Sequence, residues 1–155
     1  MSDESNHAET RSALLDAVKV AMRARDSARL ATLRLLTAAI KQREVDTRET
    51  LDEAAVISLL DKELKQRRES ISQFERAGRA DLADAERAEI TIIQEFLPRQ
   101  LDPDEVTAII DQAIADSGAT GMRDMGKVMN LLRPRLQGRA DVGAASAEVK
   151  ARLAG

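Results

Sequence analysis

The sequence predicts an all-α protein, and three observations carry that prediction. Strand-forming residues are scarce, and aromatic residues make up only 1% of the 155 positions. Apolar residues recur at three- and four-residue spacings, as in amphipathic helices. Glycine and proline, which interrupt helices, are concentrated after residue 97. We therefore expect a four-helix N-terminal bundle over residues 1–100, followed by a three-helix C-terminal bundle over residues 101–155.

The first two predicted helices form the beginning of the N-terminal domain. One covers about residues 9–25, and the other begins after Asp26, whose carboxylate can accept hydrogen bonds from the first backbone N–H groups. The apolar residues that we expect on their buried faces are Leu14, Leu15, Val18, Met22, Leu30, Leu33, Leu36, Ile40 and Val45.

The third and fourth helices complete this domain. A capping box formed by Thr50 and Glu53 is expected to begin the third helix, which continues to about residue 77. Arg67 falls where its apolar stripe expects an aliphatic residue. We expect the Arg67 guanidinium to remain in water, so that replacement by Ala costs far less stability than replacement of Leu64. The fourth helix covers about residues 81–96 and ends before Pro98.

Three shorter helices are predicted in the second domain. Asp102 begins the first as an N-cap followed by proline, and Gly118 ends it. The second starts near Met122 and is expected to break at Pro134. Asp141 can cap the last helix, after a turn that contains glycine.

Several function classes are excluded by composition and motif content. The chain has no Cys and a single His, His7, which removes disulfides, thiolate metal sites and His-based zinc sites. No nucleotide-binding loop and no nucleophile motif occurs. We therefore expect no catalytic residues, no bound metal or cofactor, and no catalysis by the chain on its own. The sequence shows neither a membrane-length apolar run nor a signal peptide, which favours a cytoplasmic protein without membrane association.

Basic residues are the remaining candidates for a binding site. The net charge is −3, but residues 117–155 carry seven basic and three acidic groups. The candidates for phosphate contacts in this segment are Arg123, Lys127, Arg133, Arg135 and Arg139. A second basic set lies on the predicted second helix, with few acids nearby: Arg29, Arg34, Lys41, Arg43 and Arg48. For both sets the alternative is an ordinary solvated face. Without aromatic platforms for stacking, RNA would be recognised by its shape and backbone.

Several sequence strings resemble the YqeY-like proteins of the GatB/YqeY family. They are TLRLLTAAIKQREVD, ELKQRRESISQFERAGRADLADAERAEI, EFLPRQL, GMRDMGKVM and LQGRAD, in family order. The resemblance implies two helical parts, the second similar to the tail domain of the B subunit of the glutamine-dependent tRNA amidotransferase. In that enzyme the tail helps to hold tRNA, and the amidation chemistry lies in other domains. The resemblance implies that residues within the matched tail motifs contact RNA or form the turn and the helix cap. These residues are Arg123, Lys127, Gly138, Arg139 and Asp141.

These observations leave three functions open. The leading hypothesis is a non-enzymatic accessory protein that associates with tRNA or another structured RNA, with Arg123, Lys127 and Arg139 contributing most. One alternative is a helical adaptor that binds a protein partner. The other is a component linked to an amidotransferase, a carbon–nitrogen ligase with glutamine as amido donor, although the chain shows neither a nucleotide site nor an amidase nucleophile.

Overall fold

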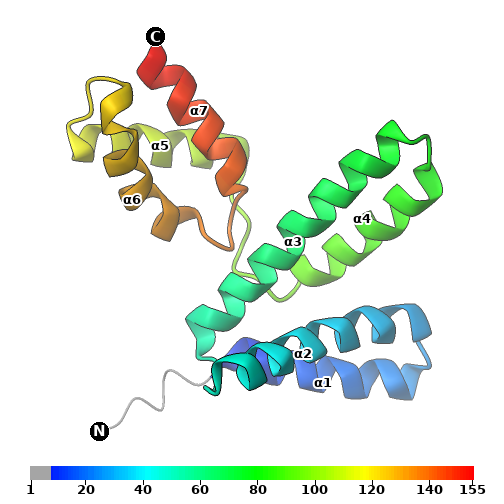
Figure 1. The fold of residues 1–155 in the computed structure, drawn as a ribbon. Coiled ribbons are helices and arrows are strands. Elements are labelled where there is room, and N and C mark those ends of the chain that lie inside the picture. Colours follow the sequence, from blue (N-terminus) through cyan, green and yellow to red (C-terminus); the bar gives the residue numbers. More distant parts are fainter. Residues whose placement is uncertain (1–7) are drawn as a thin grey trace, which may run out of the picture. The chain divides into compact units, whose positions relative to one another are not determined.

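The computed structural model describes residues 8–155, and this part of the chain is helical (Figure 1). It contains seven α-helices and a short 3₁₀ turn, with no strand among these residues. The predicted all-α fold class is therefore confirmed, while the finer arrangement as a four-helix and a three-helix bundle stays a prediction. His7 lies outside the described residues.

The chain divides into two compact units, Met1–Leu97 and Pro98–Gly155. The helices of the first unit, blue to green in Figure 1, are α1 (Glu9–Ala24), α2 (Ser27–Thr47), α3 (Glu53–Arg76) and α4 (Ala80–Gln94). Those of the second unit are α5 (Pro103–Ser117), the 3₁₀ turn η2 (Met122–Asp124), α6 (Met125–Leu136) and α7 (Val142–Ala154). Each unit has its own apolar core.

Aliphatic side chains form the core of the first unit. Helices α1 and α2 pair as one hairpin, and α3 and α4 pair as another (Figure 1). The largest fully buried side chains of this core are Leu14, Leu33, Leu36, Ile40, Val56, Leu60, Leu64 and Ile93. No aromatic ring is among them, so the helices are held by interdigitated aliphatic residues.

Part of the face that the sequence predicts to be buried on α1 and α2 is exposed in the structure. On α1 the buried residues are Leu14 and Ala21, whereas Leu15 is 48% and Met22 52% exposed. Each exposed residue follows a buried one, and one residue rotates the side chain by about 100° around a helix. Leu15 and Met22 therefore form a separate apolar stripe at the surface. On α2 the expectation for Val45 is also wrong, since this residue is 64% exposed.

The beginning of α3 differs from the predicted capping box. Asp52, rather than Thr50, caps the helix by accepting a hydrogen bond from the backbone N–H of Ala55 at 2.8 Å. The Glu53 carboxylate instead accepts the backbone N–H of Thr10 at 3.0 Å. It therefore satisfies a donor in the first turn of α1, which is 43 residues away in sequence.

Arg67 is a buried connection between α3 and α4. The residue is 8% exposed, and its guanidinium donates to Glu63 at 2.6 Å and to Glu89 of α4 at 2.8 Å. Burial lowers the pKa of Arg67, while the hydrogen bonds to both glutamates raise it, with a net rise. The expectation of a solvated head group is wrong, because α4 covers this side of α3 and supplies a carboxylate.

The second unit is built around a separate aliphatic core. Its fully buried large side chains are Ile110, Val128, Leu132, Leu136 and Val149. The predicted break at Pro134 is wrong, since α6 continues to Leu136. Proline removes one N–H donor but its fixed φ is compatible with a helix, and the apolar contacts of Leu136 hold the final turn.

Asp102 and Glu105 form the capping box that begins α5. Asp102 accepts the backbone N–H of Glu105 at 2.8 Å, and the Glu105 carboxylate accepts the backbone N–H of Asp102. Arg99 also donates to this carboxylate, at 2.7 and 2.9 Å. The hydrogen bond from Arg99 and that from the Asp102 backbone lower the pKa of Glu105 to about 2.

Replacement of Arg67 by Ala is expected to lower the free energy of unfolding by about 2 kcal/mol, because Glu63 and Glu89 would lose a charged hydrogen-bond partner. Leu64→Ala should cost about 2–5 kcal/mol through the cavity that it leaves. The exposed Lys65 is the control, and Lys65→Ala should change stability by no more than about 0.5 kcal/mol. Urea denaturation of the three variants checks this order. Equal stability of Arg67→Ala and Lys65→Ala would contradict the burial of the guanidinium.

The capping box predicts how the second unit responds to acid. The folded-state pKa of Glu105, about 2, lies below its ordinary value of 4.5. This group therefore stabilises the fold above pH 4.5, and its contribution is lost as the pH falls from there toward 2. Thermal unfolding at a series of pH values should show a smaller acid destabilisation in Glu105→Gln than in the parent. Arg99→Ala should reduce the same effect, and an unchanged profile in both variants would contradict the assignment.

Candidate functional site

The five candidate basic residues are distributed along one segment of the second unit. Arg123 lies in the 3₁₀ turn η2, and Arg139 lies in the turn that follows α6. Lys127, Arg133 and Arg135 are on α6 itself. Arg123, Lys127 and Arg133 are exposed, whereas Arg135 and Arg139 are partly buried. The five therefore do not form a uniform patch.

Arg135 and Arg139 are engaged within the protein. Arg135 forms an ion pair with Asp116 of α5 at 3.1 Å. Hydrogen bonds from Gln112 and from Arg135 lower the pKa of Asp116. The Nε of Arg139 donates to the backbone carbonyl of Arg99 at 3.4 Å. Binding of a phosphate by either arginine would compete with these contacts.

Arg123 and Lys127 lie near the carboxylate of Asp124, just before the start of α6. Asp124 accepts the backbone N–H of Thr120 at 2.9 Å. This hydrogen bond lowers the pKa of Asp124, and the positive charges of Lys127 and Arg123 lower it further. Among the residues that the structure describes, neither cation forms an ion pair within 4.0 Å. Both therefore remain available to a ligand.

Arg133 lies near the other end of α6. Arg133 is six positions after Lys127 in the sequence. This offset places the two residues about 9 Å apart along the axis and about 120° apart around the helix. Arg133 also has no ion pair within the described part of the chain. A single extended anion, such as a nucleic-acid backbone, could contact both residues, whereas a small anion could not.

The turn after α6 is held by hydrogen bonds from the segment before α5. Gly138 has a φ of +76°, and its carbonyl accepts the side-chain amide of Gln100 at 2.7 Å. The Arg139 carbonyl accepts the backbone N–H of Leu101 at 2.8 Å. Asp141 accepts the backbone N–H of Ala144 at 3.2 Å and caps α7. In this structure Gly138 and Asp141 shape the turn.

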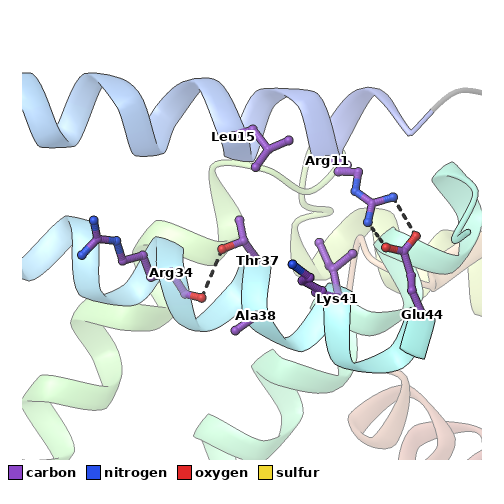
Figure 2. A pocket seen from close by; sticks show the side chains of 8 residues that line it. Arg11, Leu15, Arg34, Thr37, Ala38, Lys41 and Glu44 are labelled. Carbon is purple, nitrogen blue, oxygen red and sulfur yellow. Dashed lines mark hydrogen bonds and ion pairs between the residues drawn. The ribbon is translucent and has the colours of Figure 1, made fainter. Parts of the chain in front are cut away.

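A groove between α1 and α2 is a second feature, which sequence reasoning missed. It has a volume of about 470 Å³ and is lined by Leu15, Arg34, Ala38 and Lys41, among others (Figure 2). The excess of basic over acidic residues on α2 was visible in the sequence. Its position beside Leu15 was not, because that required the correct buried face of α1.

The described residues show no metal centre and no membrane-spanning helix. No three or more His, Cys, Asp or Glu side chains of residues 8–155 are grouped so that they could hold a metal ion. Within the same range, no helix is both long and apolar enough to cross a membrane.

Comparison with known protein families identifies the relatives of this chain. The sequence pattern of the Yqey-like protein family, YqeY, matches residues 11–153, which cover most of both helical units. The chain belongs to the YqeY family. The resemblance in the sequence strings is thereby confirmed.

Curated relatives of this YqeY-family chain occur in fungi. Proteins named "Altered inheritance of mitochondria protein 41, mitochondrial" are similar in Eremothecium gossypii, with 41% identity over 52% of this chain and 44% of the relative. The Vanderwaltozyma polyspora protein of that name is 30% identical over 70% of this chain and 62% of the relative. The Pyrenophora tritici-repentis protein is 28% identical over 79% and 68%. The chain thus spans less than half the length of the Eremothecium relative.

These names correct one prediction. The sequence favoured a cytoplasmic protein, whereas the relatives are named as mitochondrial proteins. The prediction relied on the absence of a signal peptide and of an apolar span, and neither absence distinguishes the cytoplasm from another aqueous compartment.

Two glycines of the second unit should respond in opposite ways to replacement by Ala. Gly138→Ala is expected to cost about 1–2 kcal/mol of stability, because its positive φ disfavours a side chain with a Cβ. Gly126 lies in α6, and outside its chain neighbours and the backbone of that helix no atom is within 4 Å of the position of an added Cβ. Gly126→Ala should therefore stabilise the helix by up to about 1 kcal/mol. Thermal unfolding measures both changes, and stabilisation by Gly138→Ala would contradict the geometry of the turn.

Proposed function

We propose that this YqeY-family chain is a non-enzymatic accessory protein that associates with tRNA or another structured RNA through its second, three-helix unit. The observation that carries the proposal is the pair Arg123 and Lys127, exposed at the start of α6 and without ion pairs in the described structure. Arg133 extends the basic surface along the helix. The resemblance of GMRDMGKVM and LQGRAD to a tRNA-holding tail domain supports the same function.

Charge distribution within the second unit explains why these cations are available. Five acids and no base lie in residues 102–116, which include all but the last residue of α5. Three of these acids pair with arginines: Glu105 with Arg99, Asp111 with Arg152, and Asp116 with Arg135. The acids of α5 therefore pair with arginines from other segments of the second unit. Arg123, Lys127 and Arg133 are left for a ligand.

The open backbone of α6 is compatible with a bulky anion. Apart from its chain neighbours and the backbone of its own helix, no atom lies within 4 Å of the position that a Cβ of Gly126 would occupy. A glycine within a helix permits the close approach of a neighbouring helix or of a ligand. No described helix makes that approach, which leaves the position accessible to a phosphate backbone.

The RNA proposal is tested by salt-dependent binding of the full chain to tRNA. Three phosphate contacts predict that log affinity falls with log salt concentration at a slope of about −2 to −3. The triple variant Arg123→Ala, Lys127→Ala, Arg133→Ala should lose most of the binding and flatten this slope. Fluorescence anisotropy with labelled tRNA measures both quantities, and circular dichroism checks that the helices remain.

A matched variant controls for net charge. Arg23, Lys65 and Arg76 are exposed residues of the first unit, so their replacement by Ala removes the same charge elsewhere. This variant should retain most of the tRNA affinity. Equal losses in the two triple variants, or no tRNA binding at low salt, would reject the proposal. Glutamine- and ATP-dependent amide formation by the purified chain would instead favour the amidotransferase-linked alternative.

A further inference from the structure

The groove between α1 and α2 combines an apolar centre with a cationic rim. Leu15 extends from α1 toward α2, and Ala38 lies on the α2 side (Figure 2). Arg34 and Lys41 line the same groove from α2 and are exposed. The volume of about 470 Å³ is within the usual range of about 300–1,000 Å³ for ligand-binding clefts.

The carboxylate in this groove is already used by the protein. Glu44 accepts hydrogen bonds from two guanidinium nitrogens of Arg11 and also accepts the backbone N–H of Leu51 at 2.8 Å (Figure 2). The bond from Arg11, followed by that from Leu51, lowers the pKa of Glu44. This arrangement connects α1, α2 and the segment before α3. It leaves no lining carboxylate to neutralise Arg34 and Lys41.

Arg34 and Lys41 are spaced to contact one extended acidic ligand. They are seven residues apart on α2, which places them on the same face and about 10 Å apart along the axis. Neither forms an ion pair in the described part of the chain. Ala38 lies between them, so an apolar group of the ligand would sit between two of its anionic groups.

The apolar surface continues beyond the groove on both helices. Met22 lies two turns from Leu15 on α1, and Val45 lies one turn from Lys41 on α2. All three of the apolar side chains Leu15, Met22 and Val45 are about half exposed or more. The surface therefore offers an apolar stripe longer than a single small molecule would cover.

We propose that this groove docks an acidic amphipathic segment of a partner protein. An aliphatic side chain of the segment occupies the space between Leu15 and Ala38. Two carboxylates, about 10 Å apart, pair with Arg34 and Lys41. The positive charges of Arg34 and Lys41 require a negatively charged ligand. The exposed aliphatic stripe favours a peptide over RNA, because RNA bases would require aromatic stacking platforms. The groove belongs to the first unit and the basic residues of α6 to the second, and this proposal does not depend on the RNA proposal.

The test uses the full chain and a set of fluorescein-labelled helical peptides. Each peptide carries leucines at three- and four-residue spacings and two glutamates seven residues apart. The peptides cover three registers, which differ in the position of the leucines relative to the two glutamates. At least one register should bind, and its affinity should fall as salt increases. The double variant Arg34→Ala, Lys41→Ala should bind it about tenfold or more weakly, and Leu15→Ser should also weaken it. Lys65→Ala, Arg76→Ala, which removes two exposed cations outside the groove, should bind within about twofold of the parent.

Three results would overturn the proposal. The first is that no register binds the parent chain. The second is that a peptide with both glutamates changed to glutamine binds as tightly as the acidic one, since the cations would then play no part. The third is that the double variant loses affinity for tRNA while peptide binding is unchanged, which would make the groove an RNA-binding surface. Circular dichroism of each variant confirms that the exposed substitutions leave the helices intact.

Discussion

The fold depends on the narrow aliphatic stripe that each helix contributes to the core. The sequence has no Cys, Trp or Tyr and only two Phe, and neither Phe is among the fully buried residues of the described structure, so aliphatic side chains rather than rings or disulfides join the helices. The buried faces of α2 and α6 are mainly Leu, Ile, Val and Met at helical spacing. Within each unit, the stripe of one helix packs against the stripes of the other helices. Outside these stripes the helices carry most of the charged side chains, together with exposed apolar residues such as Leu15 and Met22.

Charged side chains consequently decide which surfaces are available for binding. Arg67 is used inside the first unit, where it joins Glu63 of α3 to Glu89 of α4. Arg135 and Arg152 are used inside the second unit, where acids of α5 hold them. The cations without such partners in the described structure include Arg34 and Lys41 on α2 and Arg123 and Lys127 near the start of α6. Both proposed binding surfaces arise from this local imbalance rather than from the net charge.

Features that depend on neighbouring residues in the sequence could be predicted. Asp26 and Asp102 cap the helices that were expected after them, since an N-cap bonds to an N–H only three residues away. The outward position of Leu15 could not be predicted, because Leu14 and Leu15 are equally apolar and only packing distinguishes them. Nor could the burial of Arg67, which depends on Glu89 being brought to it by the α3–α4 turn. For the candidate site, the sequence identified the basic residues but not the contacts of Arg135 and Arg139 with distant partners.

The hydrogen bonds around Gly138 determine where the protein can be divided. Gln100 and Leu101 precede α5 in sequence, yet they satisfy the carbonyls of Gly138 and Arg139 in the turn before α7. A recombinant fragment that began at Asp102 would keep all three helices of the second unit but would leave both carbonyls without these donors. The same fragment would lack Arg99, which binds Glu105. An excised tail for crystallisation or spectroscopy therefore has to start at Arg99 or earlier.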